Sequence, residues 1–294
     1  MLQLFANLSA EQANICSLVL SSTGIVHRIR RDPHGWAVWV REQQYEAASR
    51  AMEDYFRENQ QNHIPQSPGS QTESHPQLRS NARFAEALFA AVFLMVWHLA
   101  FDWAGSKESV IRDFGASAEA IMDGQVYRAV TALMVHADAA HLAGNMLGIT
   151  VFGAAVAAET GWGLGWLMIL ISGIAGNMLN AGMYGSGHLS IGASTAVFGA
   201  IGILAGYQVA RRFQSRRRGL VAWAPLAGGL ALLGFIGSGE RVDIMAHFFG
   251  FAAGIVMGGS YVLLCRFKPG HAIQGVSLAL VLAIVLFAWV LGAR

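Results

Sequence analysis

Residues 191–210, IGASTAVFGAIGILAGYQVA, form an apolar run long enough to cross a lipid bilayer, and a serine, Ser194, lies near its start. A second run, residues 244–266 (IMAHFFGFAAGIVMGGSYVLLCR), carries a histidine, His247, at a similar depth. Polar side chains at membrane depth are unfavourable unless they are paired, so they usually face the interior of a helix bundle and mark function. The two runs therefore predict membrane-spanning helices that bring Ser194 and His247 together.

The composition of the whole chain is that of a multispanning membrane protein. Its 294 residues are 54% hydrophobic and only 13% charged, and 34 of them are glycine, which is far from the balance of a soluble domain. The formal net charge of +2 says little about partners, because the positions of the arginines matter more than their sum. Seven apolar runs are long enough to span a bilayer, at 84–104, 137–158, 161–183, 191–210, 219–237, 244–266 and 271–292.

Basic residues predict the orientation of these runs. Five arginines lie within 211–218, between the fourth and fifth runs, and Arg266 and Lys268 lie between the sixth and seventh. The positive-inside rule makes both loops cytoplasmic, which puts the N-terminus inside as well. We expect the arginines to contact anionic lipid rather than nucleic acid. The long connection at 105–136 is too polar to cross the membrane and is expected to lie in the outer interface as an amphipathic segment.

Residues 1–64 predict a small soluble domain. Ser9 followed by Gln12 is a capping-box signature at a helix start. The predicted order is α-β-β-α, with a helix that stops before Gly24, short strands at 25–30 and 36–40, and a helix at 42–59. Proline, glycine, serine and glutamine at 65–80 predict a flexible linker.

A serine hydroxyl becomes an effective nucleophile when a neighbouring base takes its proton, and histidine is the usual base at neutral pH. Small residues let two helices approach closely, and Gly250, Gly254 and Gly258 form a Gly-xxx-Gly ridge on the His247 run. Ser194 also falls in the first turn of its helix, where unpaired N–H groups favour a developing negative charge. These features predict a membrane-embedded serine hydrolase; the alternative is a packing serine and a histidine satisfied in a polar bundle core.

Three polar residues lie close together at the start of the second run: His136, His141 and Asn145. His141 and Asn145 are four residues apart, so both project from one helix face and can donate hydrogen bonds to one point. They are candidates for an oxyanion hole beside Ser194, with His136 in support. The alternatives are structural hydrogen bonding and a metal site, although no HExxH pattern or close carboxylate pair supports a metal.

Three motifs together resemble those of the rhomboid family of intramembrane serine proteases, in order and topology as well as in composition. They are His136-x4-His141-x3-Asn145, Gly192-x-Ser194 and His247-x-x-Gly250. The resemblance covers about residues 84–266 and implies a six-helix core with Ser194 as nucleophile and His247 as general base. It also implies that His141, Asn145 and the Ser194 N–H bind the oxyanion, and that the seventh run is the additional helix of the bacterial 6+1 form.

The chain departs from the family pattern at three places. Thr195 stands where the family has glycine, and we expect the helix to tolerate its β-branched side chain. Tyr127-Arg128 stands for a Trp-Arg pair in the first loop, and Phe198 stands where a tyrosine often packs on the histidine ring. None of these changes removes the Ser-His pair.

Asp243 precedes His247 by four residues and has two interpretations. It can orient the imidazole as the third member of a triad, or it can be an aspartate at the first turn of a helix near the outer interface. The family resemblance favours the second interpretation, because it implies a dyad. His98 and His188 have no assigned role.

The sequence thus predicts an all-α polytopic membrane protein with a rhomboid-like six-helix bundle, one additional C-terminal helix and a small α+β cytosolic domain. The predicted parts are a soluble domain at 1–64, a linker at 65–80, a catalytic core at 81–266 and the additional helix at 267–294. The predicted activity is that of an intramembrane serine endopeptidase, which cuts transmembrane segments near the outer face of a bacterial inner membrane. The alternative is a non-catalytic rhomboid-like protein that binds transmembrane clients. Transmembrane proteins and membrane lipid are the expected partners, with no cofactor, metal or nucleic acid, and nothing in the sequence indicates the oligomeric state.

Overall fold

The structure, a computed structural model, divides the chain into two compact units, Met1–Glu73 and Ser74–Arg294. It describes residues 1–32, 35–58, 76–103, 106–214, 223–236, 243–265 and 268–294. The linker predicted at 65–80 lies outside these residues except for its end, because a helix begins at Pro76.

The N-terminal unit is a three-stranded antiparallel sheet with two helices. The strands β1 (Leu2–Leu8), β2 (His27–Asp32) and β3 (Gly35–Val40) lie in the order β1-β3-β2. The helices are α1 (Ala10–Ser22) and α2 (Tyr45–Glu58), with the 3-10 turn η1 (Glu42–Gln44) before α2. Leu20, Val38, Val40 and Met52 form the buried core of this unit.

The predicted capping box is confirmed, whereas the predicted α-β-β-α order is wrong because it omits β1. Ser9 Oγ accepts from the N–H of Gln12 at 3.1 Å, and Gln12 Oε1 accepts from the N–H of Ser9 at 2.8 Å. β1 lies at the edge of the sheet, and its pairing with β3 contains two register shifts. Such shifts break the alternation by which a strand is recognised in a sequence, so only the pairing itself defines β1.

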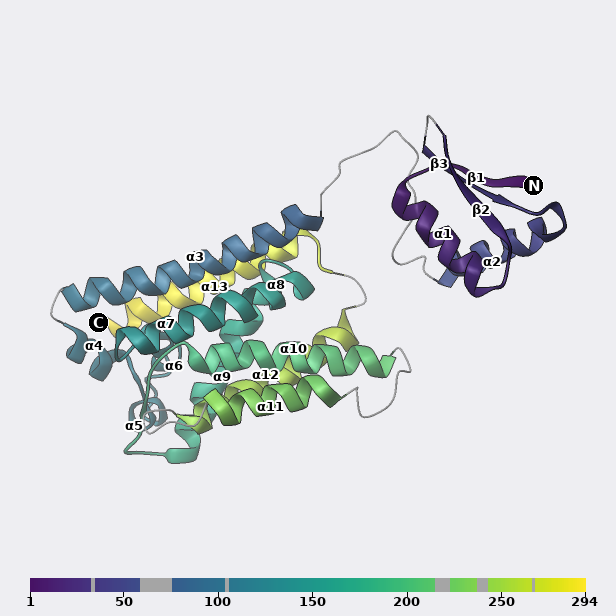
Figure 1. Cartoon of the computed structure of the whole chain (residues 1–294). Helices are drawn as coiled ribbons and strands as arrows, with labels where there is room; N and C mark the ends of the chain where they lie inside the picture. The colour runs from purple at the N-terminus through teal and green to yellow at the C-terminus, as the bar shows by residue number, and fades with distance from the viewer. Residues whose placement is uncertain (33–34, 59–75, 104–105, 215–222, 237–242, 266–267) are drawn as a thin grey trace. The chain divides into compact units, whose positions relative to one another are not determined.

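The second unit is a bundle with a helix in each of the seven predicted runs (Figure 1). These helices are α3 (Pro76–Trp103), α7 (Ala139–Gly148) continued by the π-turn η3 (Ile149–Gly153) and α8 (Ala154–Thr160), α9 (Leu164–Tyr184), α10 (Ser194–Gln214), α11 (Ala224–Ile236), α12 (Ile244–Leu264) and α13 (His271–Gly292). Among the described residues, five segments are long and apolar enough to cross a membrane: Arg83–Trp103, Ala139–Thr160, Leu164–Tyr184, Ile244–Leu264 and His271–Gly292. The chain is therefore an all-α polytopic membrane protein with a small α+β unit at its N-terminus.

The helices α10 and α11 are not among those five segments, for different reasons. α10 ends in Arg211 and Arg212, and it packs against α7, α9, α11 and α12, so most of its side chains contact protein rather than lipid. A helix in that position does not need a continuous apolar surface. The described part of α11 has 13 residues, and the rest of its predicted run lies outside the described residues.

Glycines determine how closely α10 and α12 approach each other. A Cβ atom on Gly254 would lie 2.1 Å from the carbonyl oxygen of Gly199, and one on Gly258 would lie 2.0 Å from that of Ile203. No side chain fits at these contacts, so the ridge predicted on α12 meets α10 backbone to backbone.

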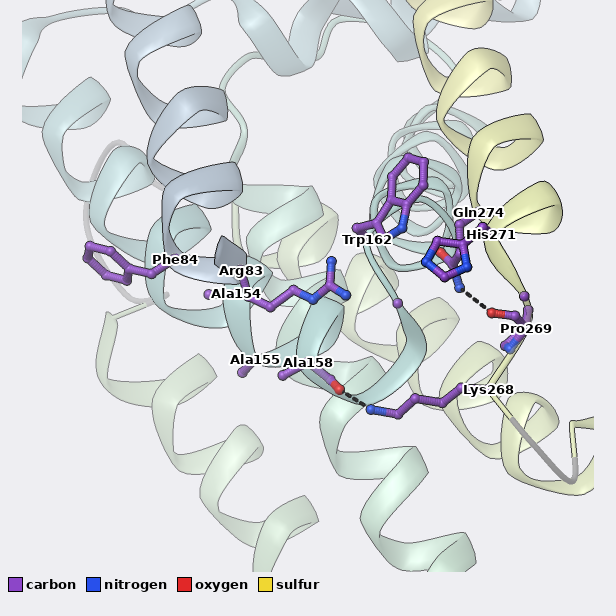
Figure 2. A pocket seen from close by; sticks show the side chains of 12 residues that line it. Arg83, Phe84, Ala154, Ala155, Ala158, Trp162, Lys268, Pro269, His271 and Gln274 are labelled. Atoms are coloured by element: carbon purple, nitrogen blue, oxygen red, sulfur yellow. Dashed lines mark hydrogen bonds between the residues drawn. The ribbon is translucent and has the colours of Figure 1, made fainter. Parts of the chain in front are cut away.

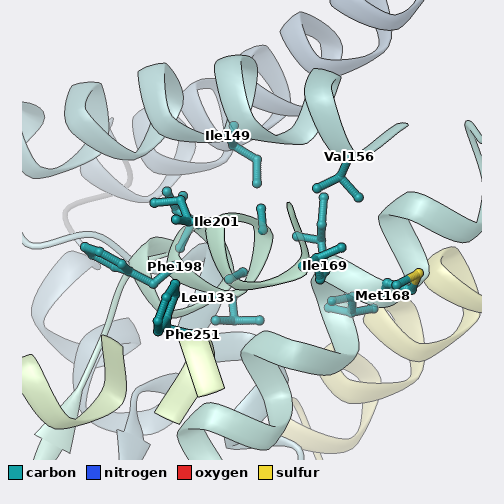
Figure 3. Close-up of a cluster of buried hydrophobic side chains, with 14 of the residues drawn as sticks. Leu133, Ile149, Val156, Met168, Ile169, Phe198, Ile201 and Phe251 are labelled. Carbon is teal, nitrogen blue, oxygen red and sulfur yellow. The ribbon is translucent and has the colours of Figure 1, made fainter. Parts of the chain in front are cut away.

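A cluster of apolar side chains lies inside the bundle. Ile149 of η3, Ile169 of α9, Ile201 of α10 and Phe251 of α12 converge there, and each is at most 7% exposed (Figure 3). Apolar side chains lose little by facing lipid, so close packing rather than exclusion from water is what these contacts contribute.

The connection between α3 and α7 is folded. It contains α4 (Lys107–Phe114), β4 (Ala116–Ser117), α5 (Ala118–Met122), α6 (Arg128–Thr131) and the 3-10 turn η2 (Ala132–Met134). The strand β4 pairs with β5 (Leu189–Ser190), which lies just before α10. The first loop is therefore tied to the segment that leads into Ser194.

Candidate active site

Ser194 and His247 lie at the same end of the bundle, where α10 and α12 begin (Figure 1). Ser194 is the first residue of α10, and His247 lies in the first turn of α12. The Oγ atom of Ser194 is 2.7 Å from Nε2 of His247, a hydrogen-bond distance. An imidazole with its proton on Nδ1 accepts the hydroxyl proton through Nε2, which is the arrangement that a general base requires.

The turn before Ser194 is held by its backbone. Gly192 has a φ angle of 109°, in the region that favours glycine. The N–H of Ala193 donates to Nε2 of His136 at 3.4 Å, and Nδ1 of His136 donates to the carbonyl of Met134 at 3.2 Å. One tautomer of His136 satisfies both contacts, so this residue supports the turn that presents the serine.

Two side-chain donors of α7 lie beside the same turn. A Cβ atom on Gly192 would lie 2.5 Å from Nε2 of His141 and 3.2 Å from Nδ2 of Asn145, so glycine is required here for space as well as for φ. Nδ2 of Asn145 is buried and has no hydrogen-bond partner among the described residues. An unpaired buried donor is costly, and it is a feature of a site prepared to bind an anion.

The ring of Phe198 stacks on that of His247, with centroids 4.6 Å apart and an interplanar angle of 26°. Phe198 lies one turn after Ser194 on α10, so the helix that carries the serine also orients the imidazole. Nδ1 of His247 is buried and has no partner in the described part of the chain. Within the described residues, the imidazole of His247 is therefore hydrogen-bonded to Ser194 and to no third side chain.

Asp243 does not reach the imidazole but caps α12. Its Oδ1 accepts from the N–H of Ala246 at 3.0 Å, and its Oδ2 accepts from Nδ2 of Asn180 and Nε2 of His188, each at 2.7 Å. The first-turn interpretation is therefore confirmed, and the triad interpretation is wrong. Burial alone raises the pKa of the Asp243 carboxyl, but hydrogen bonds from Ala246, His188 and Ser190 together lower it below its ordinary value.

The sequence reasoning missed the roles of Asn180 and His188. Asn180 is only 2% exposed, and a buried amide in an apolar run is the signal that could have identified it. His188 stacks on Tyr184, with ring centroids 3.9 Å apart. Through Asp243, these residues join the end of α9 and the loop before α10 to the start of α12.

Three histidine rings lie in a row beside the site. The centroid of His136 is 6.4 Å from that of His98 and 5.2 Å from that of His141, and both contacts are edge-to-face. Within the described residues, no group of three His, Cys, Asp or Glu side chains is arranged to hold a metal ion.

Tyr127 and Arg128 hold the first loop together, and the structure does not bring them to the serine. Nη1 of Arg128 donates to the carbonyls of Arg112 at 2.7 Å and Gly115 at 3.3 Å. Nε of Arg128 and the hydroxyl of Tyr127 donate to Oε1 of Gln125 at 2.7 and 3.1 Å. These contacts join the end of α4 to the start of α6.

Thr195, which is 1% exposed, fills the space between two glycines. A Cβ atom on Gly176 of α9 would lie 2.5 Å from Cγ2 of Thr195, and one on Gly250 of α12 would lie 2.2 Å from the Thr195 carbonyl oxygen. The side chain that departs from the family pattern is thus a packing group where α9, α10 and α12 meet.

The fold and the Ser194–His247 pair define a class, namely polytopic helical membrane proteins with a serine and a histidine paired inside the bundle. Residues 123–264, which extend from the first loop to the end of α12, match the family model described as Rhomboid domain. This match confirms the resemblance of the chain's motifs to those of the rhomboid family.

Several curated proteins are similar to this chain. RHOMBOID-like protein 1 of Arabidopsis thaliana is 29% identical over 147 residues, which cover 50% of this chain and 37% of the relative. The rhomboid protease GluP of Bacillus subtilis is 32% identical over 122 residues, which cover 41% of this chain and 24% of the relative. Rhomboid-like protease 3 of Toxoplasma gondii is 31% identical over 154 residues, which cover 48% of this chain and 54% of the relative. The chain thus spans between 24% and 54% of the length of these relatives.

Proposed function

We propose that this protein is an intramembrane serine endopeptidase that cuts the transmembrane segments of other membrane proteins. The observation that carries the proposal is the 2.7 Å contact between Oγ of Ser194 and Nε2 of His247 within a rhomboid domain. Relatives named as a rhomboid protease and a rhomboid-like protease support it.

The reaction begins when Oγ of Ser194 attacks the scissile carbonyl carbon and Nε2 of His247 takes the hydroxyl proton. The carbonyl oxygen then becomes negative. Nδ2 of Asn145, Nε2 of His141 and the N–H of Ser194 donate to it, assisted by the positive end of the α10 dipole. His247 gives its proton to the leaving amine, and water hydrolyses the acyl-enzyme with the same histidine as base.

Cleavage occurs near the outer end of the substrate segment. Ser194 and Arg211 are 17 residues apart along α10, a rise of about 25 Å, and the positive-inside rule assigns the arginine end to the cytoplasm. The N-terminal unit then lies in the cytoplasm of a bacterial cell, with the bundle in its inner membrane. A substrate helix must unwind at the cut site, because helical carbonyls are already hydrogen-bonded.

The test is a cleavage assay in proteoliposomes with a fluorogenic transmembrane peptide. Native protein is expected to cut the peptide, and Ser194→Ala and His247→Ala are each expected to abolish cutting. Ser277→Ala is the matched control, because Ser277 is a buried serine on α13, which carries none of the proposed catalytic groups. Cutting by Ser194→Ala would refute the assignment. Binding of the peptide by native protein without any cutting would instead support a rhomboid-like protein that holds clients without cleaving them.

A further inference from the structure

A pocket of about 820 Å³ lies between the start of α3, the end of α8 and the start of α13 (Figure 2). This end of the bundle is opposite to the one where α10 and α12 begin. The lining combines the basic side chains of Arg83, Lys268 and His271 with the indole of Trp162. The candidate active site uses none of these residues.

The pocket lies where membrane spans end. The apolar run of α3 follows the polar stretch 76–83 (PQLRSNAR), another span begins at His271, and one ends at Thr160 just before the next begins at Leu164. Span ends mark the boundary between hydrocarbon and headgroups, where the phosphates of lipids lie. A tryptophan such as Trp162, in the short turn between two spans, is typical of that boundary.

The basic groups are directed into the pocket from two sides. Figure 2 shows the Arg83 side chain reaching from α3 toward Trp162 and His271, while Lys268 extends along the lower side, where Nζ donates to the carbonyl of Ala158. The nearby carboxylate of Glu86 bonds Nη1 of Arg83 at 2.9 Å, from outside the pocket lining. The guanidinium therefore keeps further donors for a ligand in the pocket.

An acidic residue adjoins the pocket residue Ala158 in the sequence, but it interacts elsewhere. Glu159 interacts with Tyr207 and Arg211, so its charge is already shared with a cation.

Gln274, which is 3% exposed, accepts from the N–H groups of Gly163 and Leu164 at 2.8 and 2.9 Å and joins the turn after α8 to α13. The N-cap of α13 is Gly270, and among the described residues no side chain caps this helix, so its first N–H groups contribute partial positive charge beside the pocket.

One wall of the pocket is apolar. Phe84 lines it and is 53% exposed, and Ala154 and Ala155 of α8 also belong to the lining. A ligand that fits must therefore carry a negative headgroup next to hydrocarbon.

We propose that this pocket binds an anionic glycerophospholipid, whose phosphate contacts Arg83, Lys268 and His271 while an acyl chain lies along Phe84. A net negative headgroup is selected because the positive choline group of a zwitterionic lipid would be brought close to the same cations. The inference is independent of any chemistry at Ser194.

The test is native mass spectrometry of the delipidated full chain, with dioleoyl phosphatidylglycerol and dioleoyl phosphatidylcholine supplied in equal amounts. Native protein is expected to retain phosphatidylglycerol preferentially. Arg83→Gln and Lys268→Gln are each expected to weaken that binding about fivefold, and the double variant about 25-fold, from the contribution of each basic side chain at a membrane surface. The charge-conserving variant Arg83→Lys is expected to remain within about twofold of native protein, which separates charge from folding.

The control is Arg211→Gln/Arg212→Gln, which removes two cations from the same end of the bundle but outside the pocket. It is expected to retain the phosphatidylglycerol bound in the pocket and to lose only weaker surface contacts with anionic lipid. Three results would overturn the proposal: no preference for phosphatidylglycerol in native protein, an equal loss in the control, or displacement of the lipid by equimolar inorganic phosphate. The last result would indicate a site for a soluble anion.

Discussion

Gly250→Ala is expected to separate the candidate nucleophile from its base. The new Cβ atom would lie 2.2 Å from the carbonyl oxygen of Thr195, whereas real Cβ contacts are essentially never shorter than 3.0 Å. Both partners are helix backbone, so no side chain can move aside. The helices α10 and α12 must therefore separate by about 0.8 Å at this level, three residues from His247.

That displacement is large compared with the tolerance of the proposed chemistry. Added to the 2.7 Å contact between Ser194 and His247, it gives about 3.5 Å, which is too long for a hydrogen bond. Since misplacement by about 1 Å can cost a hundredfold in rate, we expect cleavage by Gly250→Ala to fall about 100-fold. Overpacking also costs about 1–3 kcal/mol of stability.

The assay is the proteoliposome cleavage assay together with unfolding in detergent, which separates a displaced site from an unfolded protein. Gly259→Ala is the matched control, because it lies on the same helix and its new Cβ would have no atom of the described residues within 4 Å. It is expected to retain native activity and to gain up to about 1 kcal/mol of stability. A folded Gly250→Ala variant that cleaves at the native rate would refute the reasoning.

Three further predictions concern residues around the bundle. Asp243→Asn removes the carboxylate that accepts from His188 and should lower the free energy of unfolding by about 1–3 kcal/mol at neutral pH. Because the pKa of Asp243 is lowered, this contribution is present above the ordinary carboxyl pKa and is lost as the pH falls through the lowered value, so unfolding curves of native protein and variant should converge in acid. Gln274→Leu leaves the buried N–H of Gly163 and the partly buried N–H of Leu164 unpaired and should cost about 1–3 kcal/mol, which detergent unfolding measures; a native-like curve would contradict the role of this side chain. Phe198→Leu removes the stacking on His247, worth about 0.5–1.5 kcal/mol, and should slow cleavage up to about tenfold, whereas Phe198→Tyr should keep the native rate.

The sequence predicted those features that depend on local patterns. The last run, predicted at 271–292, coincides with α13 (His271–Gly292), because Pro269 and Gly270 interrupt the chain just before a continuous apolar stretch. The spacing between His141 and Asn145 brought both to one face of α7, since four residues make about one turn.

The features that could not be predicted depend on contacts between distant residues. His188 and Asp243 are 55 positions apart, so no local period relates them. Gln274 binds a turn 111 positions away, and in the sequence it is only one polar residue near the start of an apolar run. The backbone separation between α10 and α12 is a similar case, because glycines in a sequence do not reveal which carbonyl they will face.

The π-turn at Ile149–Gly153 divides the second span into two halves, and the side chains of the two halves point in directions that a regular helix would not give them. A π-turn holds one residue more than an α-turn, so side chains after it are rotated by about 100° relative to an uninterrupted helix. His141 and Asn145 precede the turn, whereas the alanines of α8 that line the basic pocket follow it. The π-turn thus changes which face the second span presents. Its first half faces the candidate active site, and its second half faces the pocket lined by Arg83, Lys268 and His271. Removing a single residue from 149–153 would rotate one half against the other, so relatives with a regular second span should align with this chain only across a one-residue gap.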